Sequence, residues 1–300
     1  MEQYDRNELP EVSLCGIGPK EAKIAASLLT SEAVSMIEHD QALGLALEEE
    51  GEARAAVCAR LSPENETVLE IISLYVIPEY RRRGLGSTLL LELLDRMMEV
   101  TDGMLHYVTA SFLSDAQELT AMLSKLGFEM EEDDTALSWR LTVGELADSA
   151  LMEKPVSLPP HTILLPLEEF SEHQIHQLVY TLRKHHIDMM SAEEISGAHR
   201  KVSCVLLDEA AEMVGCVILT EASPEHIVLS QFFTAYKTAA PSVAMLQAAA
   251  KALMEQFPAE TLLEIPTVTS STGKLVQRLI PDSKAAGLTN AVLDLARVYE

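Results

Sequence analysis

Apolar and polar residues follow one another along the first half of the chain in blocks that predict alternating strands and helices. Short apolar runs bounded by turn residues predict strands, whereas apolar residues three and four positions apart predict the buried face of a helix. An acidic turn at Gly51 joins two such runs and predicts a β-hairpin. The expected elements are strands at 12–17, 42–49, 52–60, 68–76, 104–111 and 135–143, and helices within 19–39, after 88 and at 115–126.

The same order of elements returns after residue 160. The segment 154–160 holds three prolines, which exclude both a helix and a central strand, so we expect a linker there. Aligning the sequence of one half with that of the other places Cys58 on Cys216 and favours a tandem duplication. The alternative is an unrelated α+β domain whose strands and helices follow the same order by coincidence. The expected elements are strands at 161–167, 201–208, 212–220, 226–233, 261–268 and 291–299, and helices at 171–186, 242–256 and 273–280.

The composition agrees with two domains of ordinary size and limits the classes of molecule that the protein is expected to bind. The 300 residues suffice for two cores, and we expect domains at 1–150 and 161–300 with a proline-rich linker at 151–160. The net charge of −25 argues against nucleic acid and favours amine-bearing small partners, unless the acidic surface only aids solubility. The start has no signal-peptide pattern, and no apolar run is long enough for a membrane span. The four cysteines form no C-x-x-C pair and are expected to be buried free thiols, which indicates a cytoplasmic protein.

One turn in the first half has a pattern suited to phosphate binding. The strand ending at Val76 is followed by Pro78, by three arginines at 81–83, and by Gly84 and Gly86 at the start of an apolar helix. The first N–H groups of a helix lack carbonyl partners within it and carry the positive end of its dipole, so they bind phosphate oxygens. Glycines without a Cβ let an anion approach the main chain closely. We therefore expect a diphosphate ligand.

The turn matches neither the P-loop nor the dinucleotide fingerprint, which both need other glycine spacings. The longer string V-x-P-E-Y-R-x-x-G-x-G-x-x-L-L at 76–90 resembles the acyl-coenzyme A loop of the GNAT superfamily of N-acetyltransferases. The sequence Leu126-Gly127-Phe128 is also similar to that family, with Gly127 as the left-handed cap of the preceding helix. An ordinary strand–turn–helix connection with solvated arginines is the alternative.

The resemblance implies a fold, a co-substrate and a set of contacts. The implied class is α+β (mixed α/β), with two tandem GNAT-like domains, each a twisted, mixed, mostly antiparallel sheet flanked by helices. The implied activity is acetyl-coenzyme A-dependent transfer of an acetyl group to a primary amine of a small molecule or peptide, by direct attack in a ternary complex. No metal, nucleic acid or membrane is expected, and the chain is expected to be a monomer or homodimer. The expected coenzyme contacts are Leu74, Tyr75, Val76, Arg81, Arg82, Arg83, Gly84, Leu85, Gly86, Ser87 and Thr88.

Glu70 is the candidate base, because it is a charged residue inside an apolar strand. Its distance from Gly84 is similar to that of the base in histone-type members of the superfamily. We expect burial to raise its pKa, as a base requires, whereas a solvent-facing strand glutamate is the alternative. The resemblance further implies an oxyanion donor at a backbone N–H near Tyr75 or Val76.

The group that protonates the leaving thiolate is less well defined. Many family members carry a tyrosine where this chain has Leu123. Tyr75 and Tyr107 are the candidates in its place, although each is also typical of a sheet aromatic. A thiol is a fair leaving group as the thiolate, so an acid is not strictly required.

The second half has lost the loop. Its counterpart is 236–242, where Ala239 and Ala240 replace glycines and Pro241 removes an N–H, and the position of Glu70 falls near Val228. We therefore expect one coenzyme site per chain and a degenerate second domain. A non-catalytic acetyl-coenzyme A-binding regulatory or interaction protein is the competing interpretation.

Two charged clusters have simpler explanations than a binding site. The histidines of the predicted helix at 171–186 lack cysteine or carboxylate partners at ligand spacing, so a solvated helix is expected there rather than a metal site. The acidic run at 131–134 is predicted to be a solvated turn, with the attraction of a cationic acceptor as the alternative.

Overall fold

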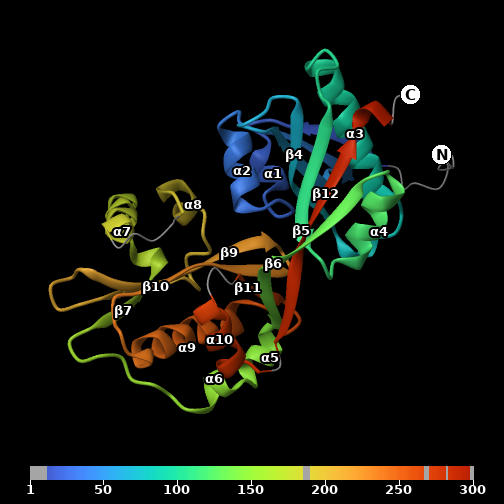
Figure 1. Ribbon diagram of the computed structural model, residues 1–300. Coiled ribbons are helices and arrows are strands. Elements are labelled where there is room, and N and C mark those ends of the chain that lie inside the picture. Colours follow the sequence, from blue (N-terminus) through green and yellow to red (C-terminus); the bar gives the residue numbers. More distant parts are fainter. Residues whose placement is uncertain (1–11, 185–189, 267–269, 282, 298–300) are drawn as a thin grey trace. The chain divides into compact units, whose positions relative to one another are not determined.

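Figure 1 shows the computed structural model, which describes residues 12–184, 190–266, 270–281 and 283–297. Its contacts divide the chain into two compact units, Met1–Thr135 with Gly287–Glu300, and Ala136–Ala286. Each unit contains a mixed sheet flanked by helices, which confirms the predicted fold class. Among the described helices, none has both the length and the apolar character needed to cross a membrane.

The sheet of the first unit follows the order β1-β2-β3-β4-β5-β12. Its neighbours are antiparallel except for β4 and β5, which run parallel. The strand β12 comes from the C-terminal end of the chain, and its residues 288–294 pair with β5. The bounds are β1 Ser13–Ile17, β2 Leu43–Glu49, β3 Glu52–Leu61, β4 Val68–Val76, β5 Tyr107–Leu113 and β12 Lys284–Asp294.

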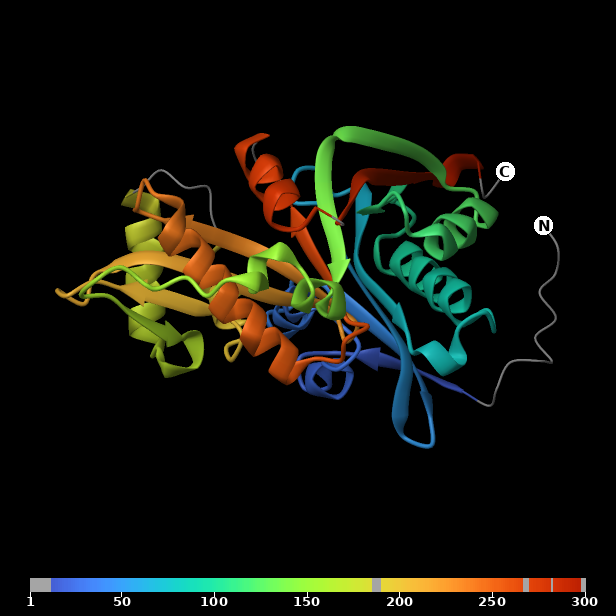
Figure 2. The same cartoon turned by 90° about the horizontal axis from the view of Figure 1, so that it is seen from below.

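Helices cover both faces of this sheet (Figures 1 and 2). Successive strand residues point to opposite faces. The side chains of Ala55 and Val57 accordingly join a core with α3, whereas those of Ala56 and Cys58 join a core with α1 and α2. The bounds are α1 Ala22–Ala25, α2 Ser31–Glu38, α3 Leu85–Val100 and α4 Gln117–Lys125. The helix α3 buries Leu85, Leu89, Leu90, Leu93, Leu94 and Met97, a stripe with helical spacing.

The second unit repeats this plan with the sheet order β6-β11-β10-β9-β8-β7. Here β10 and β11 are the parallel pair. The helices α9 and α10 lie with one core of the unit, and α7 and α8 lie with the other. The bounds are β6 Glu129–Thr142, α5 Val143–Ala147, α6 Ala150–Glu153, β7 Ile163–Pro166, α7 Glu172–Lys184, α8 Ala192–Ser196, β8 Cys204–Leu207, β9 Met213–Ser223, β10 His226–Thr234, α9 Ala239–Gln256, β11 Leu262–Pro266 and α10 Ser270–Leu279.

A β-bulge occurs at the same place in both units. The register of β3 and β4 skips Ile72, and the register of β9 and β10 skips Ser230. Glu70 and Val228 each lie two residues before the bulge, so the alignment of β4 with β10 made from sequence holds in space. The alignment of Cys58 with Cys216 is wrong by two residues, because Cys58 pairs with the residue after its bulge and the corresponding position on β9 is Ile218. A shared element order together with a shared irregularity confirms the tandem fold.

Several sequence expectations differ from the structure. The strand expected at 135–143 begins at Glu129, and the strand expected at 104–111 begins at Tyr107. The strand expected at 291–299 begins earlier and ends at Asp294, and a 3₁₀ turn, Leu295–Arg297, follows it. The acidic run at 131–134 is not a turn but part of β6, where the side chains of Glu131 and Glu132 are exposed while the backbone remains extended. Cys15 is half-buried on β1 rather than fully buried, whereas Cys58, Cys204 and Cys216 are buried free thiols. The domain bounds of 1–150 and 161–300 stay a prediction. The compact units divide the chain elsewhere, within β6 and near the start of β12.

Candidate functional site

The turn after β4 holds a left-handed residue at the start of α3. Gly84 is the N-cap of α3 with a φ of 83°, a conformation that side chains with a Cβ adopt only at a cost. The first helical hydrogen bond is donated by the N–H of Thr88 to the carbonyl of Gly84 over 2.9 Å. The N–H groups of Leu85, Gly86 and Ser87 therefore precede the helical ladder, where a helix offers no carbonyl to pair with them. This geometry suits an anion.

Gly86 has a packing role that the sequence did not reveal. A Cβ at this position would lie 3.0 Å from the Sδ of Met122 on α4 and 3.6 Å from a methyl group of Val76. The lack of a side chain thus lets the first turn of α3 pack against α4 and the end of β4. The expected approach of an anion to the backbone of Gly86 stays a prediction.

The three arginines of the turn have three different environments. The Nε of Arg81 donates to the carbonyl of Val76 over 2.9 Å, and its guanidinium lies 5.4 Å from the ring centre of Tyr75. Arg83 lies over the ring of Tyr80 at 5.0 Å. Arg82 is 85% exposed, with its Nε 3.7 Å from a carboxylate oxygen of Glu118. Arg81 therefore braces the turn, and Arg82 is the arginine most open to a ligand in solution.

The strands β4 and β5 part in the middle of the site. Their pairing runs from Val68 with Tyr107 to Ile71 with Ala110. Beyond Ile71, β4 continues to Val76 and leads directly into the turn that precedes α3. Backbone N–H groups in this segment that point away from β3 have no β5 ladder to join. The expected oxyanion donor near Tyr75 or Val76 falls within this segment, and its assignment stays a prediction.

The bulge at Ile72 decides which side chains share a face with Glu70. Glu70 lies opposite Arg60 on β3, and Tyr75 lies opposite Ala56. Residues 70 and 75 would point to opposite faces of a regular strand, because side chains alternate. The extra residue at the bulge restores them to one face, the face covered in part by α1 and α2.

The environment of Glu70 corrects one expectation about its charge. Burial raises the pKa of this carboxyl, but hydrogen bonds from Ser62 and Arg60, together with the charge of Arg60, outweigh burial and leave the pKa lowered. The Nε of Arg60 donates to the Oε2 of Glu70 over 2.8 Å, and each side chain is 29% exposed. The predicted rise in pKa is therefore wrong. Sequence reasoning missed the cause, since it treated the strand as an isolated apolar segment.

The two candidate tyrosines lie at opposite ends of the parted strands. Tyr75 is partly buried beside Arg81 of the turn that precedes α3. Tyr107 begins β5, opposite Val68 and Asp294, and is 42% exposed. Leu123, which replaces the usual tyrosine, is 1% exposed in the core of the unit. Gly127 caps α4 with a φ of 92°, as the resemblance implied.

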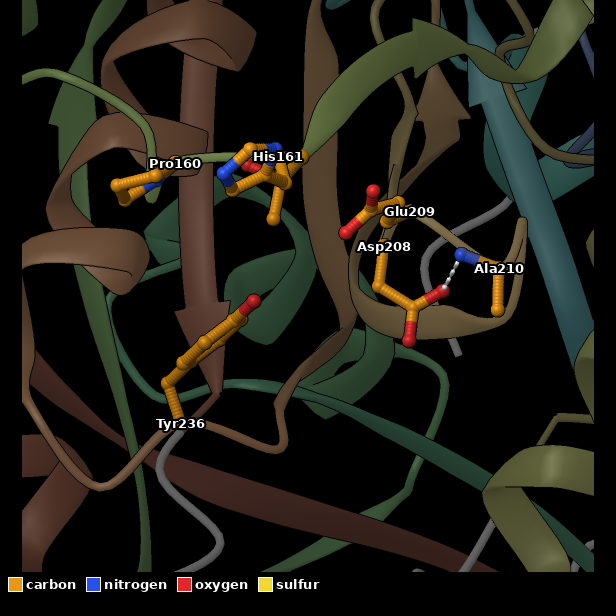
Figure 3. A pocket seen from close by; sticks show the side chains of 7 residues that line it. Pro160, His161, Asp208, Glu209, Ala210 and Tyr236 are labelled. Atoms are coloured by element: carbon orange, nitrogen blue, oxygen red, sulfur yellow. Dashed lines mark hydrogen bonds between the residues drawn. The ribbon is translucent and has the colours of Figure 1, made fainter.

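The corresponding turn of the second unit lacks the left-handed glycine of the first. The helix α9 begins at Ala239 after the N-cap Thr238, and Pro241 is buried in its first turn. Figure 3 shows an open pocket beside Tyr236 of this turn. Two carboxylates, Asp208 and Glu209, line the pocket, and an Oδ of Asp208 accepts the N–H of Ala210 over 2.9 Å. Negative charge at this position repels an anion.

The histidine-rich stretch gives no sign of a metal centre in the part of the chain that the structure describes. No group of three or more metal-ligating side chains occurs among those residues. On α7, the Nε2 of His173 lies 3.2 Å from the amide nitrogen of Gln177. His185 and His186 lie outside the described residues, so the expectation for them stays untested.

Comparison with protein families decides the relationship. Residues 19–128 match the model of the acetyltransferase (GNAT) family, a segment that contains β4, the turn, α3 and α4. This segment of the chain is therefore similar to the GNAT family of acetyltransferases. The match supports an acyltransferase, and the co-substrate that the family implies is acetyl-coenzyme A. The comparison with curated proteins gave no match.

Solved structures show the tandem form of the GNAT fold. The chain is similar to a tandem GNAT protein from the clavulanic acid biosynthesis pathway, with 11% identity, a TM-score of 0.54, and coverage of 95% of this chain and 98% of that one. At this identity the likeness concerns the fold alone. A GCN5-related N-acetyltransferase from Sphaerobacter thermophilus covers 96% of this chain and 97% of its own at 13% identity, and its TM-score of 0.44 is too low to support an argument.

Proposed function

We propose that the first unit is the catalytic domain and transfers the acetyl group of acetyl-coenzyme A to a primary amine of a small molecule or peptide. One observation carries this proposal: the strand β4 connects both parts of the site. Glu70 lies where β4 still pairs with β5, and the phosphate-binding turn follows the end of β4 that has parted from β5. Coenzyme and amine would then occupy different parts of one strand, which favours direct attack in a ternary complex.

The residues of the turn would hold the diphosphate of the coenzyme. The N–H groups of Leu85, Gly86 and Ser87 provide donors at the positive end of α3. The exposed guanidinium of Arg82 adds positive charge, and Arg81 keeps the turn closed on Val76. Leu74, Tyr75 and Val76 would line the rest of the coenzyme along β4, with Arg83 and Thr88 beside the diphosphate.

Glu70 would accept the proton of the acceptor ammonium, directly or through a water molecule. Acetyl-coenzyme A supplies the thioester carbonyl, to which the neutral amine adds, so that a C–N bond forms and the C–S bond breaks. A backbone N–H near Tyr75 or Val76 would stabilise the oxyanion of the tetrahedral intermediate. The Glu70 carboxylate is ionised at neutral pH, whereas its lowered pKa makes it a weaker proton acceptor than an ordinary carboxylate.

Tyr75 is the better placed of the two candidate acids. It shares a face with Glu70 and lies at the parted end of β4, where the thiolate would leave. Tyr107 lies at the other end of β5, before the point at which the strands part. A proton given by the Tyr75 hydroxyl to the thiolate would be restored from the proton held by Glu70 through solvent, so the cycle closes without a further reactant.

The second unit would not bind coenzyme. Its turn carries Pro241 within the first helical turn, and Asp208 and Glu209 lie beside Tyr236. These features support a single coenzyme site per chain, in the first unit.

The release of coenzyme thiol in the presence of amines, amino acids, aminoglycosides and peptides tests the proposal. Gly84→Val should weaken acetyl-coenzyme A binding by about tenfold or more, because both the left-handed backbone and the diphosphate approach are disturbed. Gly103→Val is the matched control, since Gly103 also has a positive φ of 73° and its added Cβ would meet nothing within 4 Å. Equal effects of the two substitutions, or a wild type that releases no thiol with any amine, would contradict the proposal.

A further inference from the structure

Glu70 shares its face of the sheet with the guanidinium of Arg60, whose N–H donors are only partly used among the described residues. Arg60 lies directly opposite Glu70 in the ladder of β3 and β4, and one N–H, on Nε, donates to the Glu70 carboxylate. Its other recorded side-chain contact within the described residues is weak, from Nη1 to the thioether sulfur of Met36 at 3.8 Å on α2. A guanidinium offers five donors in a planar fork, and a carboxylate is the ligand that this fork fits best. Both side chains are 29% exposed, so a small molecule in solution can reach them.

This arrangement is unfavourable for a simple amine. An acceptor amine arrives mostly as the ammonium ion, and at Glu70 it would lie close to the positive charge of Arg60. The two cations would repel each other and would compete for one carboxylate. A carboxylate elsewhere on the acceptor removes both difficulties, because it pairs with Arg60 while the ammonium pairs with Glu70.

We propose that the acceptor is an amino carboxylate, such as a free amino acid, whose amine binds at Glu70 and whose carboxylate binds the guanidinium of Arg60. The inference rests on the proposed function, because it takes Glu70 as the residue that receives the amine. The ammonium of the ligand then lies beside the negative charge of Glu70, and its carboxylate lies beside the positive charge of Arg60.

Binding of this kind also prepares Glu70 for its task. Hydrogen bonds from Ser62 and Arg60 and the charge of Arg60 favour the ionised form of Glu70. On the same face, the charges of Glu32 on α2 and of Arg60 act in opposite directions on the pKa of Cys58. A substrate carboxylate on the remaining donors of Arg60 offsets part of the positive charge that favours ionised Glu70. The carboxylate of Glu70 then becomes a better proton acceptor at the moment when the ammonium is beside it.

The test compares amino acids with their primary amides, which keep the amine and lose the charge. Glycine, β-alanine and 4-aminobutyrate are assayed against glycinamide, β-alaninamide and 4-aminobutanamide, and kcat/KM is measured for each pair. In the wild type the best acid should exceed its amide by about 10- to 100-fold, the usual value of a hydrogen-bonded charge pair. In Arg60→Met this ratio should fall close to one, and Arg60→Lys should give an intermediate value. A ratio within one variant is insensitive to any change that the substitution makes in the basicity of Glu70.

Two controls keep the result interpretable. Arg96→Met removes an exposed arginine of α3 and should leave the ratio unchanged. For probes that are not turned over, saturation-transfer NMR in the presence of coenzyme A measures binding, and the acid should again bind more tightly than the amide. Equal preference for acid and amide, binding of neither, or a ratio that survives Arg60→Met would overturn the inference and leave acetyl transfer to other amines intact. Failure of acetyl-coenzyme A to bind would overturn the proposed function itself.

Discussion

Replacing Glu70 with glutamine separates the catalytic role of this residue from its structural role. Glutamine is nearly isosteric and keeps an oxygen that accepts from Arg60, so the fold and the coenzyme affinity should persist. Loss of the half-buried ion pair at 2.8 Å should cost about 1 kcal/mol, between the values for exposed and buried pairs. For a unit of this size the melting temperature should fall by about 2–4 °C.

The effect on rate should be much larger than the effect on stability. A positioned general base contributes about 10²-fold or more, which corresponds to about 2.7 kcal/mol of barrier. The assay is initial-rate thiol release at saturating acetyl-coenzyme A, corrected for the folded fraction. Raising the pH should partly rescue the variant, because more of the acceptor amine is then neutral. Glu66→Gln, an exposed glutamate just before β4, is the matched control and should behave as the wild type.

Two results would refute this reasoning. A folded Glu70→Gln variant that turns over at the wild-type rate from pH 6 to 9 would show that Glu70 is not the base. A lower melting temperature with an unchanged rate per folded molecule would assign Glu70 a structural role alone.

Two further predictions concern stability. Arg60→Met should lower the free energy of unfolding by about 1 kcal/mol at pH 7. Because the pKa of Glu70 is lowered in the folded state, this difference from wild type should be complete above the ordinary carboxyl pKa and should disappear as the pH falls through the lowered folded pKa. Urea titrations at several pH values measure the difference, and a difference independent of pH would argue against this account. Leu293→Ala should destabilise the first unit by about 2–5 kcal/mol, since Leu293 of β12 is 3% exposed in its core; Val292→Ala, at a 36% exposed neighbour, should change the melting temperature little, and similar effects of the two would mean that β12 does not complete this core.

Local patterns predicted much of the fold because their causes are local. The strand β4 was placed at its observed bounds, since β-branched and apolar residues fill the segment up to the turn. The buried stripe of α3 and the glycine cap of α4 follow from helical spacing and from the low cost of a positive φ at glycine. The same locality made the left-handed Gly84 at the start of α3 predictable from the sequence.

Features that depend on pairing across the sheet escaped prediction. The partner of Glu70 is Arg60, ten positions earlier, and only the register of β3 with β4 brings the two together. The bulge at Ile72, which returns Tyr75 to the face of Glu70, leaves no composition signal. The pairing of β12 with β5 joins positions as far apart as Ser111 and Asn290, and a duplicated element order predicts a domain boundary instead. The contact between Gly86 and Met122 likewise joins two helices.

Calorimetric titration of acetyl-coenzyme A into the whole protein tests the central claim most directly. We expect one binding event per chain, abolished or strongly weakened by Gly84→Val and unaffected by changes in the turn of the second unit, such as Lys237→Ala. A stoichiometry of two per chain would show that the turn at 236–242 also binds coenzyme. The absence of any binding to the wild type would contradict the account as a whole.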